Sequence, residues 1–148
     1  MLDGRVPSVW EIPSGLGLFT LLLAIDAQRY EDEQLNALAK RFRDAGLVYL
    51  CAWGPGCEQV HTLFDLAFIA EEVAGVERPF LMTTDHDGEA LAEALWFSID
   101  LALQEDVRDP AESPVLIGTD ADEWCQEIRH WLSDVDDLRR HVTDDLGS

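Results

Sequence analysis

Four short, continuously apolar segments alternate with four longer segments of helical periodicity, and this alternation limits the possible folds more than any other feature of the chain. The apolar segments cover residues 18–25, 47–53, 79–84 and 114–118. The helical segments cover residues 31–45, 57–74, 88–104 and 121–140. Strands that are apolar at every position are covered on both faces, as in parallel sheets built from strand-helix-strand units. The pattern predicts a three-layer α/β sandwich, Rossmann-like or flavodoxin-like, with about four parallel strands and four helices.

The helical segments also indicate where individual helices begin and end. Residues 121–140 carry a stripe of apolar residues spaced three or four apart, which consists of Trp124, Ile128, Trp131, Val135 and Leu138. We expect Asp120 to be the N-cap of this helix, because a carboxylate can accept hydrogen bonds from the free N–H groups of the first turn. Gly46 follows residues 31–45 and suits the left-handed position at a helix C-terminus.

The whole chain has the size of one domain. It contains 148 residues, close to the commonest domain length. Residues 18–148 carry all the periodic segments, and we predict that they form a single α/β domain, with a polar linker at residues 105–113. Residues 1–17 are rich in proline and glycine, which predicts an irregular lead-in that covers one edge of the sheet.

The charge of the chain restricts its partners. Thirty Asp and Glu against ten Lys and Arg give a net charge of −20, far beyond the magnitude of about 2–8 that keeps a small domain soluble. A field of this sign repels phosphate backbones and anionic lipid headgroups, so we expect no direct binding to nucleic acid and none to membranes. A basic protein partner is favoured instead. A surface that is acidic only for solubility is the alternative.

Three features favour a cytoplasmic location. The N-terminal residues lack the pattern of a basic segment followed by an apolar one that marks a secretory signal. No apolar run approaches the roughly 20 residues of a membrane span. Cys51, Cys57 and Cys125 are odd in number and do not form the disulfide framework of a small secreted protein.

The predicted fold indicates where a site would lie, because open parallel sheets bind ligands beyond the carboxyl ends of their strands. Polar segments follow each of the four predicted strands at this edge. They supply the candidate binding residues Trp53, Asp26, Asp85, Asp87 and Asp120. The four carboxylates are oxygen ligands of the kind that magnesium prefers. The chain has none of the glycine-rich motifs that cradle phosphates, however.

Cys57, His61 and His86 are candidates for a more specific site, either a zinc site or a catalytic one. Cys57 and His61 are four residues apart on one predicted helix, and His86 follows the neighbouring predicted strand. A thiolate with two imidazoles suits zinc, and a carboxylate or water would complete the tetrahedron. The same three residues are candidates for catalysis, since a thiol at a helix N-terminus can be activated by the helix dipole. Ordinary core and capping roles are the alternative.

Two motifs resemble those of a family of small, uncharacterised bacterial α/β proteins. The first is CAWGPGCEQVH at residues 51–61, and the second is MTTDHDGE at residues 82–89, followed by EALWF at residues 93–97. The resemblance covers roughly residues 18–104. It implies a bacterial, cytosolic α/β protein and no particular activity.

Two classes of function are therefore compatible with the sequence. The first is a protein-binding module, of a regulatory or immunity type, that uses its negative charge to engage a basic partner. The second is a metal-dependent or thiol-dependent enzyme that uses Cys57, His61 and His86 at the sheet edge. The excess of acidic residues favours the binding module.

Overall fold

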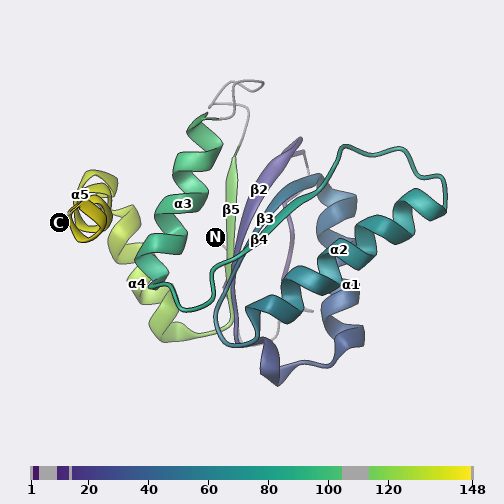
Figure 1. Cartoon of the computed structure of the whole chain (residues 1–148), viewed down its shortest axis with the longest axis horizontal. Coiled ribbons are helices and arrows are strands. Elements are labelled where there is room, and N and C mark those ends of the chain that lie inside the picture. The colour runs from purple at the N-terminus through teal and green to yellow at the C-terminus, as the bar shows by residue number, and fades with distance from the viewer. Residues whose placement is uncertain (1, 4–9, 14, 105–113, 148) are drawn as a thin grey trace.

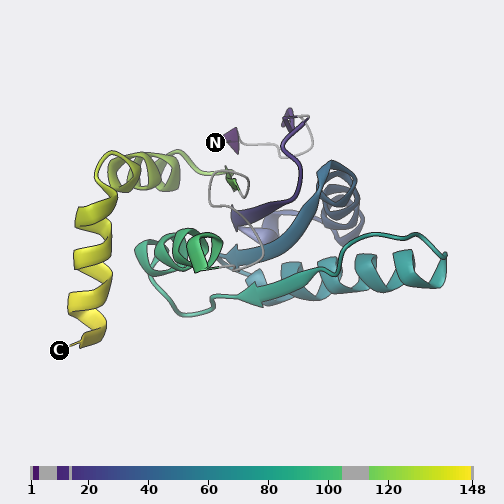
Figure 2. The ribbon, with the colours of Figure 1, turned by 90° about the horizontal axis from the view of Figure 1, so that it is seen from above.

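A computed structural model of the chain describes residues 2–3, 10–13, 15–104 and 114–147. Its centre is one parallel sheet in the order β1-β5-β2-β3-β4, seen from two directions in Figures 1 and 2. The strands are β1 (Leu2–Asp3), β2 (Phe19–Ala24), β3 (Leu47–Trp53), β4 (Met82–Asp85) and β5 (Val115–Thr119). The predicted parallel α/β sandwich is confirmed.

Helices cover both faces of this sheet (Figure 1). They are α1 (Asp32–Ala45), α2 (Cys57–Val73), α3 (Leu91–Gln104), α4 (Asp122–Leu132) and α5 (Val135–Gly147), with a short 3-10 helix, η2 (Ala27–Arg29), after β2. Helices α1 and α2 pack on one face, and α3, α4 and α5 lie on the other. Two separate hydrophobic clusters result, one on each side of the sheet.

The single helix predicted over residues 121–140 is wrong, because the structure breaks it into α4 and α5. The break falls at Ser133 and Asp134. The Ser133 hydroxyl donates to the His130 carbonyl at 2.5 Å, and the Asp134 carboxylate accepts from the Asp137 N–H at 3.1 Å. Short polar side chains that bond to the nearby backbone end one helix and begin the next. The apolar stripe continues across the break, so periodicity alone did not show it.

The ends of the sheet differ in detail from the predicted segments. Leu2–Asp3 lies within the lead-in and forms β1, which pairs with β5 at one edge. Trp10, also in the lead-in, is buried against Gly118 of β5. The third strand begins at Met82, three residues later than predicted, because residues 77–81 approach the sheet without pairing. The linker predicted at 105–113 lies outside the described residues.

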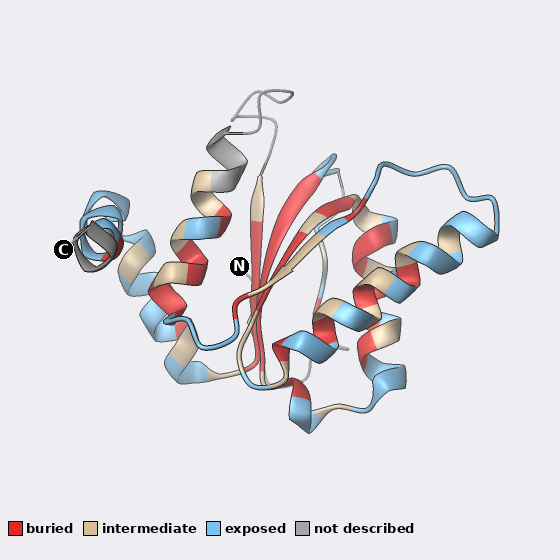
Figure 3. Ribbon diagram, viewed as in Figure 1, coloured by how far each residue is buried: buried red, intermediate tan, exposed pale blue. Residues whose placement is uncertain are grey.

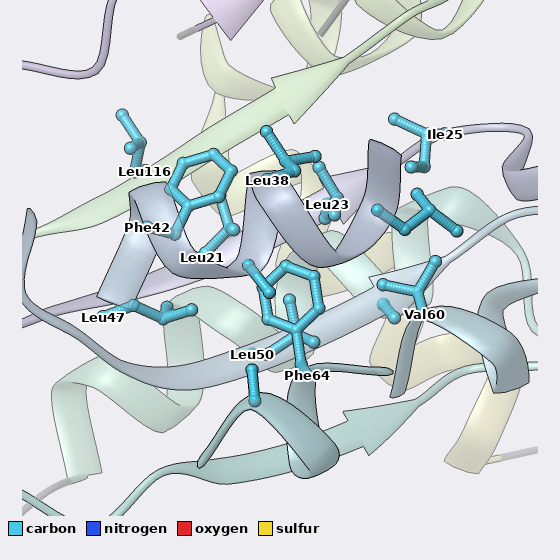
Figure 4. Packing of buried hydrophobic residues seen from close by; sticks show 14 of the residues in the cluster. Leu21, Leu23, Ile25, Leu38, Phe42, Leu47, Leu50, Val60, Phe64 and Leu116 are labelled. Carbon is cyan, nitrogen blue, oxygen red and sulfur yellow. The ribbon is translucent and has the colours of Figure 1, made fainter. Parts of the chain in front are cut away.

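Burial is greatest in the central strand. Every residue of β2 is buried, and Figure 4 shows its Leu21 and Leu23 packed among side chains of α1 and α2, including Phe42 and Phe64. Gly46 ends α1 in the left-handed conformation, as predicted, with φ of 118°. A side chain there would clash, since a Cβ atom would lie 2.2 Å from the Gly17 carbonyl oxygen. Glycine therefore fixes the tight turn from α1 into β3.

Candidate functional site

The parallel sheet brings the polar ends of its strands to one edge, but the residues there separate into distinct groups. Chain order and sheet order diverge at β2, because β3 lies on one side of it and β5 on the other. Asp26 and Asp120 follow β2 and β5 at this switch point, where open α/β sheets bind ligands. His61, Asp85 and His86 lie near the end of β4, two strands away.

Asp120 is not the helix N-cap that the sequence predicts. The N-cap of α4 is Ala121, and the Asp120 side chain points instead toward the segment after β2, where it is buried. It accepts a hydrogen bond from the Tyr30 hydroxyl at 2.6 Å. Burial, and then the bond to Asp120, raise the pKa of Tyr30 above its ordinary range. This carboxylate holds two loops together.

Asp26 belongs to the same group and also has a structural role. Its carboxylate accepts from the Gln28 N–H at 3.1 Å and so caps η2. Its own N–H donates weakly to the Asp120 carboxylate, at 3.4 Å. Asp85 is bonded elsewhere, to His61. Of the four carboxylates suggested for magnesium, Asp26 and Asp120 thus lie together, apart from Asp85.

Cys57 lies in the hydrophobic core rather than at an accessible edge. It is buried beside Val60, Phe64 and Ala67, the residues through which α2 packs on the sheet. Burial raises the pKa of the Cys57 thiol, although a hydrogen bond from the His86 backbone opposes this. Burial also raises the pKa of Cys51 to about 12. Both shifts are opposite to those of a reactive thiolate, so neither thiol is activated.

The imidazole of His86 lies on the face of the sheet that α3 covers, opposite to α2. Its ring contacts Phe97 of α3, with the ring centroids 4.7 Å apart. It is buried and bonded to Glu89 at 2.5 Å and to Thr84 at 3.0 Å. Cys57, His61 and His86 are therefore not brought together. Among the described residues, no group of three or more His, Cys, Asp or Glu side chains is arranged to hold a metal ion.

His61 occupies a different setting, an open acidic pocket between α2 and the end of β4. Its Nδ1 lies 2.8 Å from Asp85, and its Nε2 lies 3.1 Å from Asp65. Asp65 also accepts from the Thr83 hydroxyl at 2.6 Å. The pocket has a volume of about 350 Å³ and is lined by Glu58, His61, Thr62, Asp65, Leu66 and Asp85.

The chemistry of this pocket favours binding of a cation over covalent catalysis. Three of its lining residues are carboxylic acids, and none is a cysteine. The Thr62 hydroxyl donates to the Glu58 carbonyl of its own helix at 3.0 Å, so it is not poised as a nucleophile. Carboxylate oxygens are the preferred acceptors for the ammonium of lysine and the guanidinium of arginine.

Trp53 and Asp87 were the other candidate binding residues. The Trp53 indole N–H donates to the Glu89 carbonyl at 2.8 Å. Its ring packs edge-on against Trp124 of α4, with centroids 5.0 Å apart. Trp53 thus connects the end of β3 to the segment before α3 and to α4. Asp87 is exposed in the turn before α3.

The sequence reasoning missed an exposed apolar surface on α2, whose outward side is largely exposed (Figure 3). Leu66, Ile69 and Val73 lie there, 53%, 51% and 85% exposed, and we call these three residues the α2 stripe. A signal for it was present, because α2 is apolar around most of its circumference, whereas a helix on the surface of a monomer usually has one polar face. Contiguous exposed apolar side chains mark interaction sites.

Carboxylates run beside the α2 stripe. Glu58, Asp65 and Glu72 are spaced seven residues apart, two helical turns each, so they form a row along α2. Asp65 joins this row to the acidic pocket. The stripe, the row and the pocket together form one surface, apolar along the stripe and negative along the side that the row and the pocket occupy.

Comparison with known proteins places the chain in a family. A family model described as Domain of unknown function (DUF7684) matches residues 5–135. The chain belongs to this family. The resemblance to an uncharacterised family is thereby confirmed, and membership of DUF7684 assigns no activity. No curated protein and no solved structure matches the chain. Among the described residues, no helix is long and apolar enough to cross a membrane.

Proposed function

We propose that this protein is a binding module that engages a basic protein partner through the α2 stripe and the acidic pocket beside it. The observation that carries the proposal is the exposure of Leu66, Ile69 and Val73 next to a row of carboxylates. Burying a large aliphatic side chain contributes about 1.5–3 kcal/mol when burial is complete. Three such side chains in contact with a partner supply a substantial apolar core for an interface.

The negative charge of the protein affects both which partners bind and how fast they associate. The net charge of −20 attracts cationic surfaces and repels anionic ones over the Debye length, about 8 Å at physiological salt. Electrostatic complementarity raises the association rate more than it raises the affinity. The expected partner therefore combines apolar side chains with lysine or arginine, and its association rate falls as salt is added.

The enzyme alternative has less support from the same residues. Catalysis by Cys57 needs an accessible thiol of lowered pKa, whereas burial raises the pKa of that thiol. The imidazoles of His61 and His86 have separate partners on different faces of the sheet. A site for a binding partner requires neither feature.

The proposal can be tested with two labelled peptides of equal lysine and leucine content. One has leucines at helical spacing and the other has them at alternate positions, so the test does not depend on the conformation of the partner. Fluorescence anisotropy measures binding to the wild-type protein and to the double variant Ile69→Ser, Val73→Ser. The matched control is Leu132→Ser, which removes an exposed apolar side chain from α4, on the opposite layer.

We expect at least one peptide to bind, and the double variant to weaken its binding at least tenfold. The control should stay within twofold of wild type, because Leu132 lies outside the proposed surface. Binding should also weaken when NaCl is raised from about 0.05 M to 0.5 M. Failure of both peptides to bind, or an equal loss in the double variant and the control, would contradict the proposal.

A further inference from the structure

Strand β4 is the outermost strand on its side of the sheet (Figure 2). It pairs with β3 from Tyr49 opposite Met82 to Ala52 opposite Asp85, and within the described residues no strand pairs with its other edge. The His86 N–H, immediately after β4, donates to the Ala52 carbonyl of β3 at 2.9 Å. Because backbone groups of successive residues in a strand point to opposite edges, those of Thr83 and Asp85 point away from β3.

The two faces of β4 differ in chemistry, since successive side chains point to opposite faces. On the α2 face, the side chains of Thr83 and Asp85 bond to Asp65 and His61, respectively, beside the acidic pocket. On the α3 face, Met82 is 48% exposed. Phe97 of α3 is also partly exposed there, and its ring centroid lies 6.5 Å from that of Tyr49, the partner of Met82 in β3.

We propose that an extended segment of the partner adds to the sheet as a further strand beside β4, with basic and apolar side chains in alternation. Its basic side chains would lie across the acidic pocket, with their aliphatic stems over the neighbouring α2 stripe, and its apolar side chains would face Met82 and Phe97. The backbone groups of Thr83 and Asp85 would supply the pairing. Strand addition of this kind takes affinity from the main chain and specificity from alternate side chains. This inference rests on the proposed function and states how the partner is recognised.

Charge complementarity selects a basic segment over a second copy of this chain. Pairing of two β4 edges would bring their Asp85 side chains and acidic pockets together, and like charges across paired strands are destabilising. Each copy also carries a net charge of −20. A short edge strand with a charged residue is a known protection against self-association. The same negative charge attracts a cationic strand.

The test compares the alternating lysine-leucine peptide with a copy N-methylated at every second residue, which has lost the hydrogen-bond donors of one strand edge. Since methylation can remove the donors of either edge, both methylated registers are measured. We expect the unmethylated peptide to bind more tightly than its helically patterned isomer, and at least one methylated register to bind at least tenfold more weakly. This comparison uses only the wild-type protein.

A pair of variants tests the edge from the protein side. Thr83→Pro removes one of the two outward N–H groups of β4, a change that edge strands accept when that N–H faces solvent. Thr83→Val removes the same hydroxyl, with its bond to Asp65, but keeps the N–H. We expect Thr83→Pro to weaken binding of the alternating peptide at least tenfold relative to Thr83→Val. Amide hydrogen exchange of the wild-type protein should show new protection at Thr83 and Asp85 when that peptide binds.

The outcomes separate this inference from the proposed function. If the helically patterned peptide binds at the α2 stripe and neither methylation nor Thr83→Pro affects the alternating peptide, strand addition is refuted while the binding module stands. If neither peptide binds, both proposals fail. Unchanged exchange at Thr83 and Asp85 in the bound protein would also refute strand addition, even if Thr83→Pro failed to fold.

Discussion

The hydrogen bond between Tyr30 and Asp120 connects the segments that follow β2 and β5, and its contribution to stability can be measured by substitution. Substitution of Tyr30 by Phe removes only the hydroxyl that donates to the Asp120 carboxylate at 2.6 Å. The Asp120 side chain is completely buried, so water has no direct access to replace the lost donor. Among the described residues, the Asp26 N–H lies 3.4 Å and the half-exposed Arg29 guanidinium 3.8 Å from this carboxylate.

The expected cost follows from the charge of the acceptor. A hydrogen bond to a charged group contributes about 1.5–3 kcal/mol, against about 0.5–1.5 kcal/mol for a neutral pair. We therefore expect Tyr30→Phe to lower the free energy of unfolding by about 2 kcal/mol, which for a domain of this size lowers Tm by about 4–8 °C. In the Asp120→Asn background, the same change should cost only about 1 kcal/mol.

Urea unfolding of the four proteins in this double-mutant cycle measures the coupling between the two residues. The folded protein raises the pKa of Tyr30, so above about pH 10 the unfolded chain loses the phenolic proton while the folded chain keeps it. Stability attributable to this group is thus fully present below pH 10 and declines above it. Tyr30→Phe should make the alkaline decline less steep. An equal cost of Tyr30→Phe in both backgrounds would refute the assigned bond.

Three further predictions concern stability and binding. Because burial raises the pKa of Cys51 to about 12, stability should fall as pH rises above about 9, and Cys51→Ala should flatten that fall between pH 8 and 10.5 in urea titrations. Arg43→Met removes a buried guanidinium that is bonded to Glu71 at 2.9 Å; a loss of about 3 kcal/mol is expected by calorimetry, and a loss under 1 kcal/mol would contradict the role of this pair. Duplex DNA should not bind at about 0.15 M salt, and salt-sensitive micromolar binding in an anisotropy titration would contradict the electrostatic reasoning.

The fold could be predicted from local patterns because burial on both faces requires continuous apolarity. Residues 47–53 are apolar throughout, and they form β3 with the predicted ends. Gly46 could be assigned for the same kind of local reason, since a left-handed residue must end α1. The break between α4 and α5 was not predicted, because the bonds made by Ser133 and Asp134 compete with a helical pattern that runs on through them.

The candidate site was harder to predict, because its geometry depends on rotation and on packing between layers. Cys57 and His61 are four residues apart, but they lie on different sides of α2. Cys57 lies with Val60 and Phe64 on the buried side, while the His61 side chain is directed toward Asp85. His86 directly follows Asp85 in the chain, but successive side chains of an extended segment point to opposite faces of the sheet, so the two side chains lie on different faces. The edge position of β4 depends on strand order, which a single sequence does not specify.

The central claim is that a basic partner binds at one defined place and is not attracted uniformly to an acidic surface. Backbone amide shifts in NMR spectra of the labelled protein, followed during titration with the alternating lysine-leucine peptide, test this claim most directly. We predict that the largest shifts fall in α2 and β4, around Ile69 and Thr83, and saturate with a single site. Small shifts spread over the acidic residues of α4 and α5, without saturation, would contradict the claim.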